Sequence, residues 1–299
     1  MFINTNTRLV SPEFDYLQPK TLAEAFSMLD EHGTSAKLLA GGTDLLVQMK
    51  MERQQPSHVI SLSRVKELDG IKSGNGLTIG AMTSIRSVSR SEPVKADYAA
   101  LQEACNAYST VSVMLMGTLG GNICNASPAA DTAPALMVFD ASAVLKSAKG
   151  ARKVLLREFF TGPGKTVMQP GEILTAIELP KPVRGTGSAF MKISRVVADI
   201  SQVCVAVVLV RDGDKITDCR IALGSVGPTP VRMKHAVSAL IGQRGTAEAF
   251  VAAADIVSKD ITPITDVRAT EKYRRHVARI IVRDALQKAW LRAAEGAAK

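Results

Sequence analysis

Two short segments carry the residue types that could bind a charged ligand. Each places a pair of glycines after an apolar run: Leu38–Leu46, "LLAGGTDLL", and Thr118–Asp131, "TLGGNICNASPAAD". Glycine admits positive φ and lets a ligand approach bare backbone, and successive N–H groups in such turns form nests suited to a pyrophosphate. Either segment alone is more often a tight turn, but two similar segments far apart in the chain favour one nucleotide held between two subdomains.

The side chains of these segments could add neutral donors and acceptors. Four could donate to a bound diphosphate: Thr43, Thr118, Asn122 and Ser127. Two carboxylates could accept from ribose or ribityl hydroxyls, Asp44 or Asp131. Together they predict a site that binds a nucleotide through hydrogen bonds.

The common nucleotide and catalytic motifs are missing. No GxGxxG opens a helix after the first strand, so a Rossmann site is not supported. The segment 161–166, "TGPGKT", has Phe159 where a P-loop needs its first glycine. No serine nucleophile elbow is present, and the histidines form neither a metal set nor a triad: His32, His58, His235 and His276. We predict no catalytic residue and no metal ligand.

Composition narrows the class of protein. The 299 residues are 46% hydrophobic, enough for one large core or two ordinary ones. The four cysteines are scattered without a CxxC pair, which argues against a disulfide framework or an iron–sulfur site in this chain. No apolar run approaches the roughly 18 residues of a membrane span, and residues 1–19 lack the layout of a signal peptide. A soluble, cytoplasmic protein is expected.

The net charge of +9 suggests an anionic partner or substrate. Aromatic residues make up only 4% of the chain, which disfavours a single-strand nucleic-acid binder with stacking platforms. Much of the positive charge lies in 268–292, where an apolar stripe at helical spacing predicts a solvated or subunit-facing helix. The stripe contains Val277, Ile280, Ile281, Ala285 and Leu291. We predict no nucleic-acid partner.

The elements that must position the two segments alternate between helix and strand. Thr21 and Glu24 form a capping box that opens a helix over 21–32, and Gly33 ends it. A strand is expected before the first glycine pair and an apolar stretch after it, with further strands at 58–65, 76–85 and 172–180. We also expect a hairpin turning at Lys149-Gly150, and helices over 93–115 and 131–139. After Pro180–Pro182 come β segments, with a hairpin turning at Asp212-Gly213, and then helix over 246–295.

In these segments the chain resembles the FAD-binding (medium) subunit of the xanthine dehydrogenase family, the molybdenum hydroxylases. "AGGTDL" and "TLGGN...ASP..D" are similar to the family's two pyrophosphate segments, and "FFTGPGKT...PGEILTAIELP" and "SAFMKISR...DIS" follow in the family's order. The resemblance covers essentially the whole chain. Thr43-Asp44 stands where carbon monoxide dehydrogenase medium subunits carry His-Ser, which weakens that substrate assignment, and the cysteine-rich insert of the hydroxybenzoyl-CoA reductase branch is absent.

The resemblance implies an α+β chain of two domains. The first, over 1–180, would be a vanillyl-alcohol-oxidase-type (PCMH-like) FAD-binding domain with two α/β subdomains at about 1–60 and 61–180. The second would be a C-terminal α+β domain over 181–299. The resemblance also implies the residues that hold FAD. The first cradle would be Lys37, Leu38, Leu39, Ala40, Gly41, Gly42, Thr43, Asp44 and Leu45. The second would be Thr118, Gly120, Gly121, Asn122 and Ser127, with Asp131 on the sugar side, Ile173 or Leu174 near the flavin ring, and Lys192 at its carbonyl edge.

The resemblance further implies a role and partners. FAD would be non-covalent, because neither glycine segment contains a histidine. The large subunit, which carries a molybdenum cofactor, would pass electrons to a small [2Fe–2S] subunit. The small subunit would pass them to FAD in this chain, and FAD to NAD or another acceptor. The assembly would be a dimer of heterotrimers. Two alternatives stay open. A self-sufficient flavoprotein oxidase or reductase would need acid/base side chains over the flavin, and a basic scaffold would bind no flavin.

Overall fold

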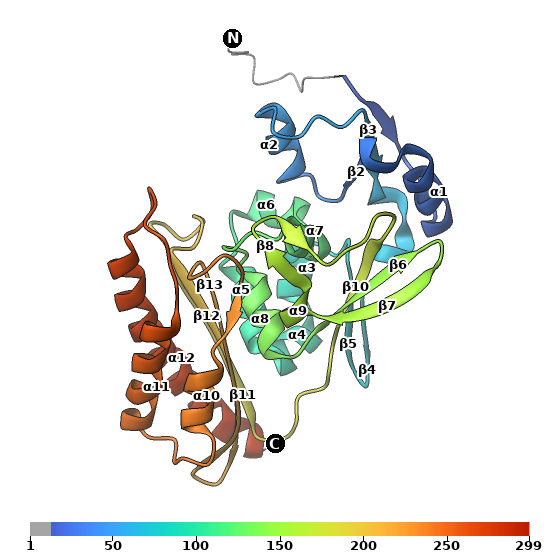
Figure 1. The fold of residues 1–299 in the computed structure, drawn as a ribbon. Coiled ribbons are helices and arrows are strands. Elements are labelled where there is room, and N and C mark those ends of the chain that lie inside the picture. The colour runs from blue at the N-terminus through green and yellow to red at the C-terminus, as the bar shows by residue number, and fades with distance from the viewer. Residues whose placement is uncertain (1–12, 299) are drawn as a thin grey trace.

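The N-terminal part of the chain forms a small parallel sheet that carries the first glycine pair. The computed structural model describes residues 13–298; residues 1–12, on which much of the signal-peptide expectation rests, lie outside that range. Strands β1 (Asp15–Leu17), β3 (His58–Ser61) and β2 (Ala36–Leu39) pair in that order, all parallel. Helices α1 (Leu22–His32) and α2 (Leu45–Lys50) supply the crossovers that parallel strands require (Figure 1).

Helix α1 begins and ends where the sequence predicts. The Thr21 hydroxyl accepts from the backbone N–H of Glu24 at 3.2 Å, and the Glu24 carboxylate accepts from the N–H of Lys20 at 2.7 Å. Gly33 follows with φ of 53°, a conformation that glycine adopts without steric cost. The capping box is thus confirmed, and it fixes where the chain turns back into β2.

A five-stranded antiparallel sheet follows, in the order β4-β5-β10-β6-β7. Its strands are β4 (Ile71–Gly74), β5 (Gly76–Gly80), β10 (Ile173–Leu179), β6 (Ser142–Ser147) and β7 (Gly150–Leu155). Ser147 pairs with Gly150, so the hairpin turn falls at Ala148–Lys149, one residue before the predicted position. The single turns η1 (Gly33–Ser35), η2 (Leu62–Arg64), η3 (Lys66–Leu68) and α9 (Leu156–Phe159), and the small β8 (Phe160–Gly162) and β9 (Lys165–Thr166) pair, complete the connections.

The helices between β5 and β6 cover this sheet and differ from the prediction. They are α3 (Ile85–Arg90), α4 (Glu92–Asp97), α5 (Ala99–Asn106), α6 (Val111–Met116), α7 (Leu119–Asn125) and α8 (Thr132–Val138). The single helix predicted over 93–115 is wrong, because it is divided at Tyr98 and again before Val111. Tyr98 leaves the helical conformation, with ψ of 51°, to bury its ring edge-on against Phe139 and donate its hydroxyl to Pro180 O at 3.0 Å. Tertiary packing overrides helical periodicity here.

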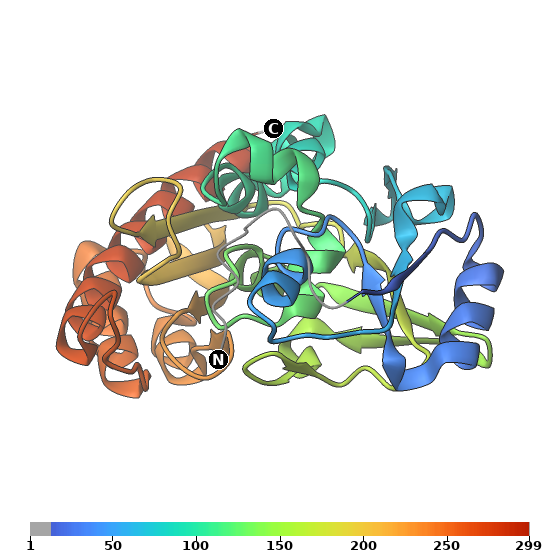
Figure 2. The ribbon, with the colours of Figure 1, turned by 90° about the horizontal axis from the view of Figure 1, so that it is seen from above.

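The C-terminal part contains a four-stranded antiparallel sheet between two layers of helices (Figures 1 and 2). Its strands are β11 (Thr186–Ile193), β12 (Val203–Asp212), β13 (Lys215–Gly224) and β14 (Val231–Arg232). Asp212 pairs with Lys215, which moves the hairpin turn to Gly213–Asp214. Strand β12 is apolar without alternation because both its faces are covered. Cys204, Ala206 and Val208 join the core of the five-stranded region, whereas Val205 and Val207 join the core under the C-terminal helices.

The last three helices are α10 (Lys234–Leu240), α11 (Ala247–Asp260) and α12 (Glu271–Ala298). The predicted apolar stripe on α12 is confirmed in its middle, where Val277, Ile281 and Ala285 are buried, but Leu291 is exposed. The region predicted to be helical, 246–295, consists of α11 and α12, with a non-helical segment between Asp260 and Glu271. No helix within residues 13–298 combines the length and the apolar character needed to cross a membrane.

Candidate functional site

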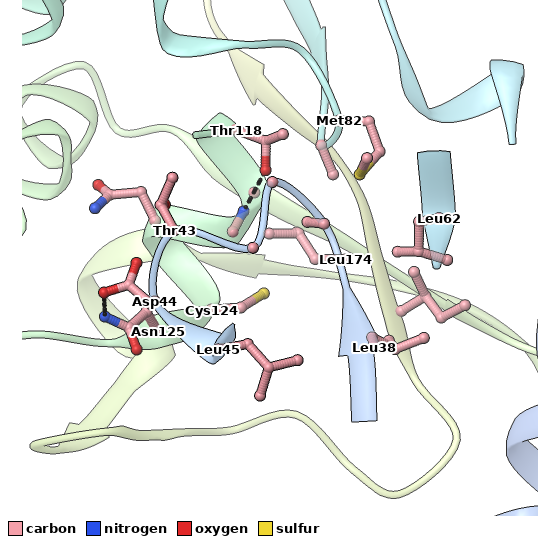
Figure 3. Close-up of a pocket in the computed structure, with 18 of the residues that line it drawn as sticks. Leu38, Thr43, Asp44, Leu45, Leu62, Met82, Thr118, Cys124, Asn125 and Leu174 are labelled. Atoms are coloured by element: carbon pink, nitrogen blue, oxygen red, sulfur yellow. Dashed lines mark hydrogen bonds between the residues drawn. The ribbon is translucent and has the colours of Figure 1, made fainter. Parts of the chain in front are cut away.

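A cavity of about 250 Å³ lies between the turn after β2 and helix α7, with β10 along one side (Figure 3). The first glycine segment forms one wall and the second segment forms the opposite wall. Most of the predicted cofactor-binding residues line it: Leu38, Ala40, Gly41, Gly42, Thr43, Asp44, Leu45, Thr118, Gly120, Gly121, Asn122, Ile173 and Leu174. The fold therefore brings together two segments that the sequence places far apart.

The remaining predicted residues lie outside this cavity. Lys37 and Leu39 are neighbours of Leu38 on β2 and point to the other face of the strand, since side chains alternate along a strand. Ser127 and Asp131 line a second, adjoining cavity that also includes Thr43, Asp44 and Asn122. Lys192 lines neither cavity; it is on β11 and reaches Asp131.

The first glycine segment presents bare backbone to the cavity. Within residues 13–298, the N–H groups of Gly41, Gly42, Thr43 and Asp44 have no hydrogen-bond acceptor. Gly42 has φ of 75°, which requires glycine in practice. A Cβ on Gly41 would overlap the carbonyl oxygen of Met116, so this glycine lets the segment lie directly against the end of α6. The segment is a row of unpaired donors held against rigid backbone.

The second glycine segment is different, because its glycines lie in the first turn of α7 and not in a loop. Thr118 caps this helix by accepting from Gly121 N at 3.0 Å. Leu119 N donates to Thr83 O at 3.0 Å and Gly120 N to Ala81 O at 2.9 Å. The N–H groups expected to form a second nest are therefore already bonded within the protein.

Gly120 is required by packing. A Cβ there would lie 2.6 Å from the Cβ of Ala81 and 2.7 Å from its carbonyl oxygen. Asn122, predicted as a donor to the diphosphate, uses its amide internally: Nδ2 donates to the Tyr108 hydroxyl at 3.3 Å, and Oδ1 accepts from Thr132 at 2.6 Å. In this second wall, tight packing leaves little room for movement, and most polar groups already have hydrogen-bond partners within the protein.

A hydrogen-bond chain crosses the cavity between the walls. Asn125, at the end of α7, donates from Nδ2 to the Asp44 carboxylate at 3.1 Å (Figure 3). Its Oδ1 accepts from Gln48 Nε2 at 3.3 Å. Asp44 occupies the N-cap position of α2 but makes no capping bond there. Burial raises the pKa of its carboxyl. Its polar atoms face the other wall instead of its own helix.

A buried ion pair lies beside the second cavity. Lys192 Nζ donates to Asp131 Oδ2 at 2.6 Å and to Ala107 O at 2.9 Å, and both charged side chains are about 5% exposed or less. The other oxygen of Asp131 is buried and has no partner among the described residues. Burial raises the Asp131 pKa to about 7, because desolvation outweighs the attraction of Lys192. Asp131 is thus strongly desolvated, and its unpartnered oxygen is buried and not exposed to the cavity.

Strand β11, which carries Lys192, is an edge strand whose backbone is held by side chains. Glu103 accepts from Phe190 N at 2.9 Å and pairs with Arg292 at 2.6 Å. Arg292 also donates to Ser188 O at 2.7 Å. These bonds join α5, β11 and α12, and so fix the strand from which Lys192 reaches Asp131.

Sequence reasoning missed part of the lining. The missed residues are Gln48, Leu62, Ala81, Met82, Tyr108, Cys124, Asn125 and Met168. Cys124 and Asn125 lie inside the second glycine segment and could have been named from it. Tyr108 lines both cavities, yet it lies inside the helix predicted over 93–115 and nothing local distinguishes it. Cys124 is partly buried and donates to the sulfur of Met168 at 3.7 Å, and desolvation raises its pKa to about 12.

Comparison with known proteins decides the family. Residues 12–182 match the family described as FAD binding domain in molybdopterin dehydrogenase, and residues 188–289 match the CO dehydrogenase flavoprotein C-terminal domain. The chain belongs to the FAD-binding subunits of the molybdenum hydroxylases. It is therefore an oxidoreductase subunit with an FAD-binding domain, and the predicted PCMH-like fold is confirmed.

Relatives of this subunit match along nearly their whole length. The chain is 36% identical over 287 residues to the carbon monoxide dehydrogenase medium chain of Hydrogenophaga pseudoflava, covering 96% of this chain and 100% of that one. The xanthine dehydrogenase FAD-binding subunit of Escherichia coli O157:H7 is 31% identical over 92% of this chain and 95% of its own length. The structure of carbon monoxide dehydrogenase from Hydrogenophaga pseudoflava superimposes with a TM-score of 0.92 at 36% identity, over 95% of this chain and 99% of that one.

Proposed function

We propose that this subunit holds FAD non-covalently in the cleft between the first glycine segment and α7, and passes electrons through it. The observation that carries this is the row of unpaired N–H groups over residues 41–44, which faces α7 across the cavity. Such a row suits a diphosphate, because each N–H can donate to an anionic oxygen without displacing a protein partner. No histidine lines the cavity within the described residues, which supports non-covalent binding.

Other residues around the two cavities could bind the flavin ring and the sugar part of the cofactor. Apolar side chains line part of the cavity and offer a dry surface for a planar ring: Leu62, Met82, Ile173 and Leu174. The contact of Asp131 with a sugar or ribityl hydroxyl stays a prediction: its unpartnered oxygen is an acceptor beside the second cavity, but that atom is buried, so a hydroxyl would reach it only after local rearrangement. Lys192 holds Asp131 in place and contributes positive charge near the second cavity; its contact with the flavin ring stays a prediction. FAD, when bound, supplies the redox chemistry of accepting and releasing electrons.

We further infer the assembly in which this chain works. A small [2Fe–2S] subunit would deliver electrons from a large molybdenum-cofactor subunit, in a dimer of heterotrimers, and NAD or another acceptor would remove them. The relatives support this, since they are named medium chains or FAD subunits of dehydrogenases for carbon monoxide, glyceraldehyde, xanthine and nicotinate. Similar chains serve such different substrates that the organic substrate is determined outside this subunit. The division at 180 into an FAD-binding and a C-terminal domain, the two subdomains, and a cytoplasmic location stay predictions.

The purified chain tests the cofactor assignment. Its visible spectrum should show bound flavin, and acid precipitation should release all of it as FAD, distinguished from FMN by chromatography. Yellow colour left in the precipitate would contradict non-covalent binding, and a colourless chain that takes up no added FAD would contradict the assignment as a whole.

One observation favours testing the alternative of a self-sufficient oxidase or reductase. The buried Asp131–Lys192 pair, with the Asp131 pKa near 7, is the kind of perturbed pair that acid–base chemistry uses. Anaerobic flavin absorbance separates the two functions. In the relay function, purines, aldehydes and N-heterocycles should not bleach the FAD of the isolated chain, whereas NADH or dithionite should. Rapid bleaching by any of the organic substrates without other subunits would establish the alternative.

A further inference from the structure

The two walls of the FAD cleft are joined by side chains at one residue. Both described side-chain hydrogen bonds between residues 40–50 and residues 118–131 are made by Asn125. One goes to Asp44, at the end of the row of unpaired N–H groups, and the other to Gln48, one turn further along α2. All three residues line the cavity.

The chemistry of this chain of bonds requires an amide at position 125. An ionised carboxylate can only accept, and Gln48 presents its Nε2 donor, so the residue between them must donate on one side and accept on the other. Asparagine does both with a short, stiff side chain. Its position is also fixed, because Ala126 ends α7 in the left-handed conformation and its carbonyl accepts from Gly164 N at 3.0 Å.

Two other contacts hold the first wall on either side of this point: Gly41 lies against the carbonyl oxygen of Met116, and Met49 of α2 is fully buried. Helix α2 spans only Leu45–Lys50, and its N-cap residue Asp44 does not cap it. The hydrophobic cluster under α1 includes Leu62 and Ile173 and has Leu38 packed against it, so it holds β2 before the turn, but it contains none of residues 41–48. The direction in which the N–H groups of residues 41–44 point therefore depends in part on what holds Asp44.

We propose that Asn125 is a positioning residue for the FAD cleft: by holding Asp44 and Gln48 from α7, it aims the unpaired N–H groups of residues 41–44 at the cofactor's diphosphate. This rests on the proposed function, in which the cleft binds FAD. Asn125 acts through the first glycine segment and Asp44 acts as its anchor, not as a ligand of the ribose or flavin.

Exchange of the two side chains is the sharpest test. In Asn125→Asp, two carboxylates face each other at the place of the 3.1 Å bond, and they repel unless they share a proton. In the double variant Asp44→Asn, Asn125→Asp, the new amide at position 44 donates to the new carboxylate at 125, which also accepts from Gln48. All three groups are then satisfied again, although the charge has moved to the other wall.

The measurement is the FAD dissociation constant of the full-length chain after removal of flavin, by fluorescence titration from pH 5 to pH 9. Asn125→Asp should weaken FAD binding roughly 10- to 100-fold at pH 8, and less at the acid end of the range, because burial already raises the Asp44 pKa and a facing carboxylate favours a shared proton. The double variant should return to within about 3-fold of the parent across the range, because all three side chains again have hydrogen-bond partners. Asn125→Ala should weaken binding without a new pH dependence.

Other titratable groups near Asp44 are common to all variants. Tyr108 faces it across the second cavity and Cys124 lies in the cleft, each with a pKa raised to about 12, outside the measured range. Asp131, with a pKa raised to about 7, also lies beside the second cavity and affects every variant alike. Asn75→Asp, in the exposed β4–β5 turn, is the matched control for the added charge and should bind FAD as the parent does.

The outcomes separate this inference from the proposed function. If the parent binds no FAD, the function fails, whatever Asn125 does. If the parent binds FAD and Asn125→Asp binds it equally well at pH 8, the positioning role is wrong. A double variant that binds as weakly as Asp44→Asn alone would show that the Asp44 carboxylate contacts the cofactor directly, and would also overturn the proposal. If Asn125→Asp does not fold, unchanged affinity in Asn125→Ala would have the same effect.

Discussion

The two glycine segments are alike in sequence and opposite in structure. The first is a turn between β2 and α2 whose N–H groups over residues 41–44 are free, and the second is the first turn of α7, whose N–H groups are bonded to Thr83, Ala81 and Thr118. In each pair, one glycine is needed for close approach to another backbone: Gly41 to Met116 and Gly120 to Ala81. The same dipeptide thus makes a donor row on one wall and a tightly packed support on the other.

The largest expected effect is on stability, and it tests whether Gly120 on the second wall serves packing and not cofactor binding. Gly120→Val should abolish stable folding, with a loss of more than about 3 kcal/mol, because the added side chain overlaps Ala81 at 2.6–2.7 Å inside the core. Expression in soluble form and the thermal midpoint measure this. A soluble, cooperatively unfolding Gly120→Val would show that the second wall is not rigid.

The next effect concerns the donor row. Gly42→Val should leave a folded chain with a far-ultraviolet circular dichroism spectrum like the parent's, yet weaken FAD binding by about 100-fold or more. The β-branched side chain resists the φ of 75° and turns the N–H groups away from the cleft. Gly121→Val should also reduce FAD retention by narrowing the cavity. Equal FAD affinity of folded Gly42→Val and parent would contradict a donor row on the first wall.

The two carboxylates of the walls should differ in their response to pH. Asp44 is bonded to a neutral amide, whereas Asp131 is paired with Lys192 and has a folded pKa of about 7. That pKa is above the value of about 3.9 for an unfolded aspartate. Between about pH 4 and pH 7 the Asp131 carboxyl is therefore protonated more in the folded state than in the unfolded state. Through this group the stability falls as pH rises from about 4 to about 7, by at most about 1.4 kcal/mol per pH unit, and is constant above. Urea unfolding at pH 5 and pH 7.5 should show this slope in the parent and not in Asp131→Asn.

The smallest effect is the loss of a single cap. Thr118→Val removes the hydroxyl that accepts from Gly121 N and should cost about 1 kcal/mol, which lowers the thermal midpoint of a chain of this size by roughly 2–4 °C. FAD affinity should change far less than in Gly42→Val, because the second wall contributes support and not donors. A loss of affinity as large as that of Gly42→Val would mean that the two walls share the diphosphate equally.

Local signals in the sequence predicted local structure well. The Thr21–Glu24 capping box and the Gly33 stop set the ends of α1 correctly, since every atom involved lies within a few residues. The division of 93–115 could not be predicted in this way. It depends on Tyr98 reaching Phe139 and Pro180, which are distant in sequence.

The same limit applies to the site. The motifs identified both walls and the family, but they could not reveal that the N–H groups of Leu119 and Gly120 are bonded to carbonyl oxygens contributed by residues 83 and 81. They also could not pair Asn125 with Asp44, because that contact depends on how two subdomains meet. Composition and spacing show which groups are present, whereas their availability to a ligand depends on tertiary hydrogen bonding.

Strand β12 belongs to two hydrophobic cores, which limits where the chain can be cut into separately folding fragments. Its Cys204, Ala206 and Val208 complete the core beneath α5 and α8, while its opposite face completes the core beneath α11 and α12. A fragment ending near residue 180 would keep both glycine walls but leave the apolar sides of α5 and α8 exposed to water. Such a fragment should self-associate on expression, so autonomous folding of the cofactor-binding half requires the strand that follows it in the chain.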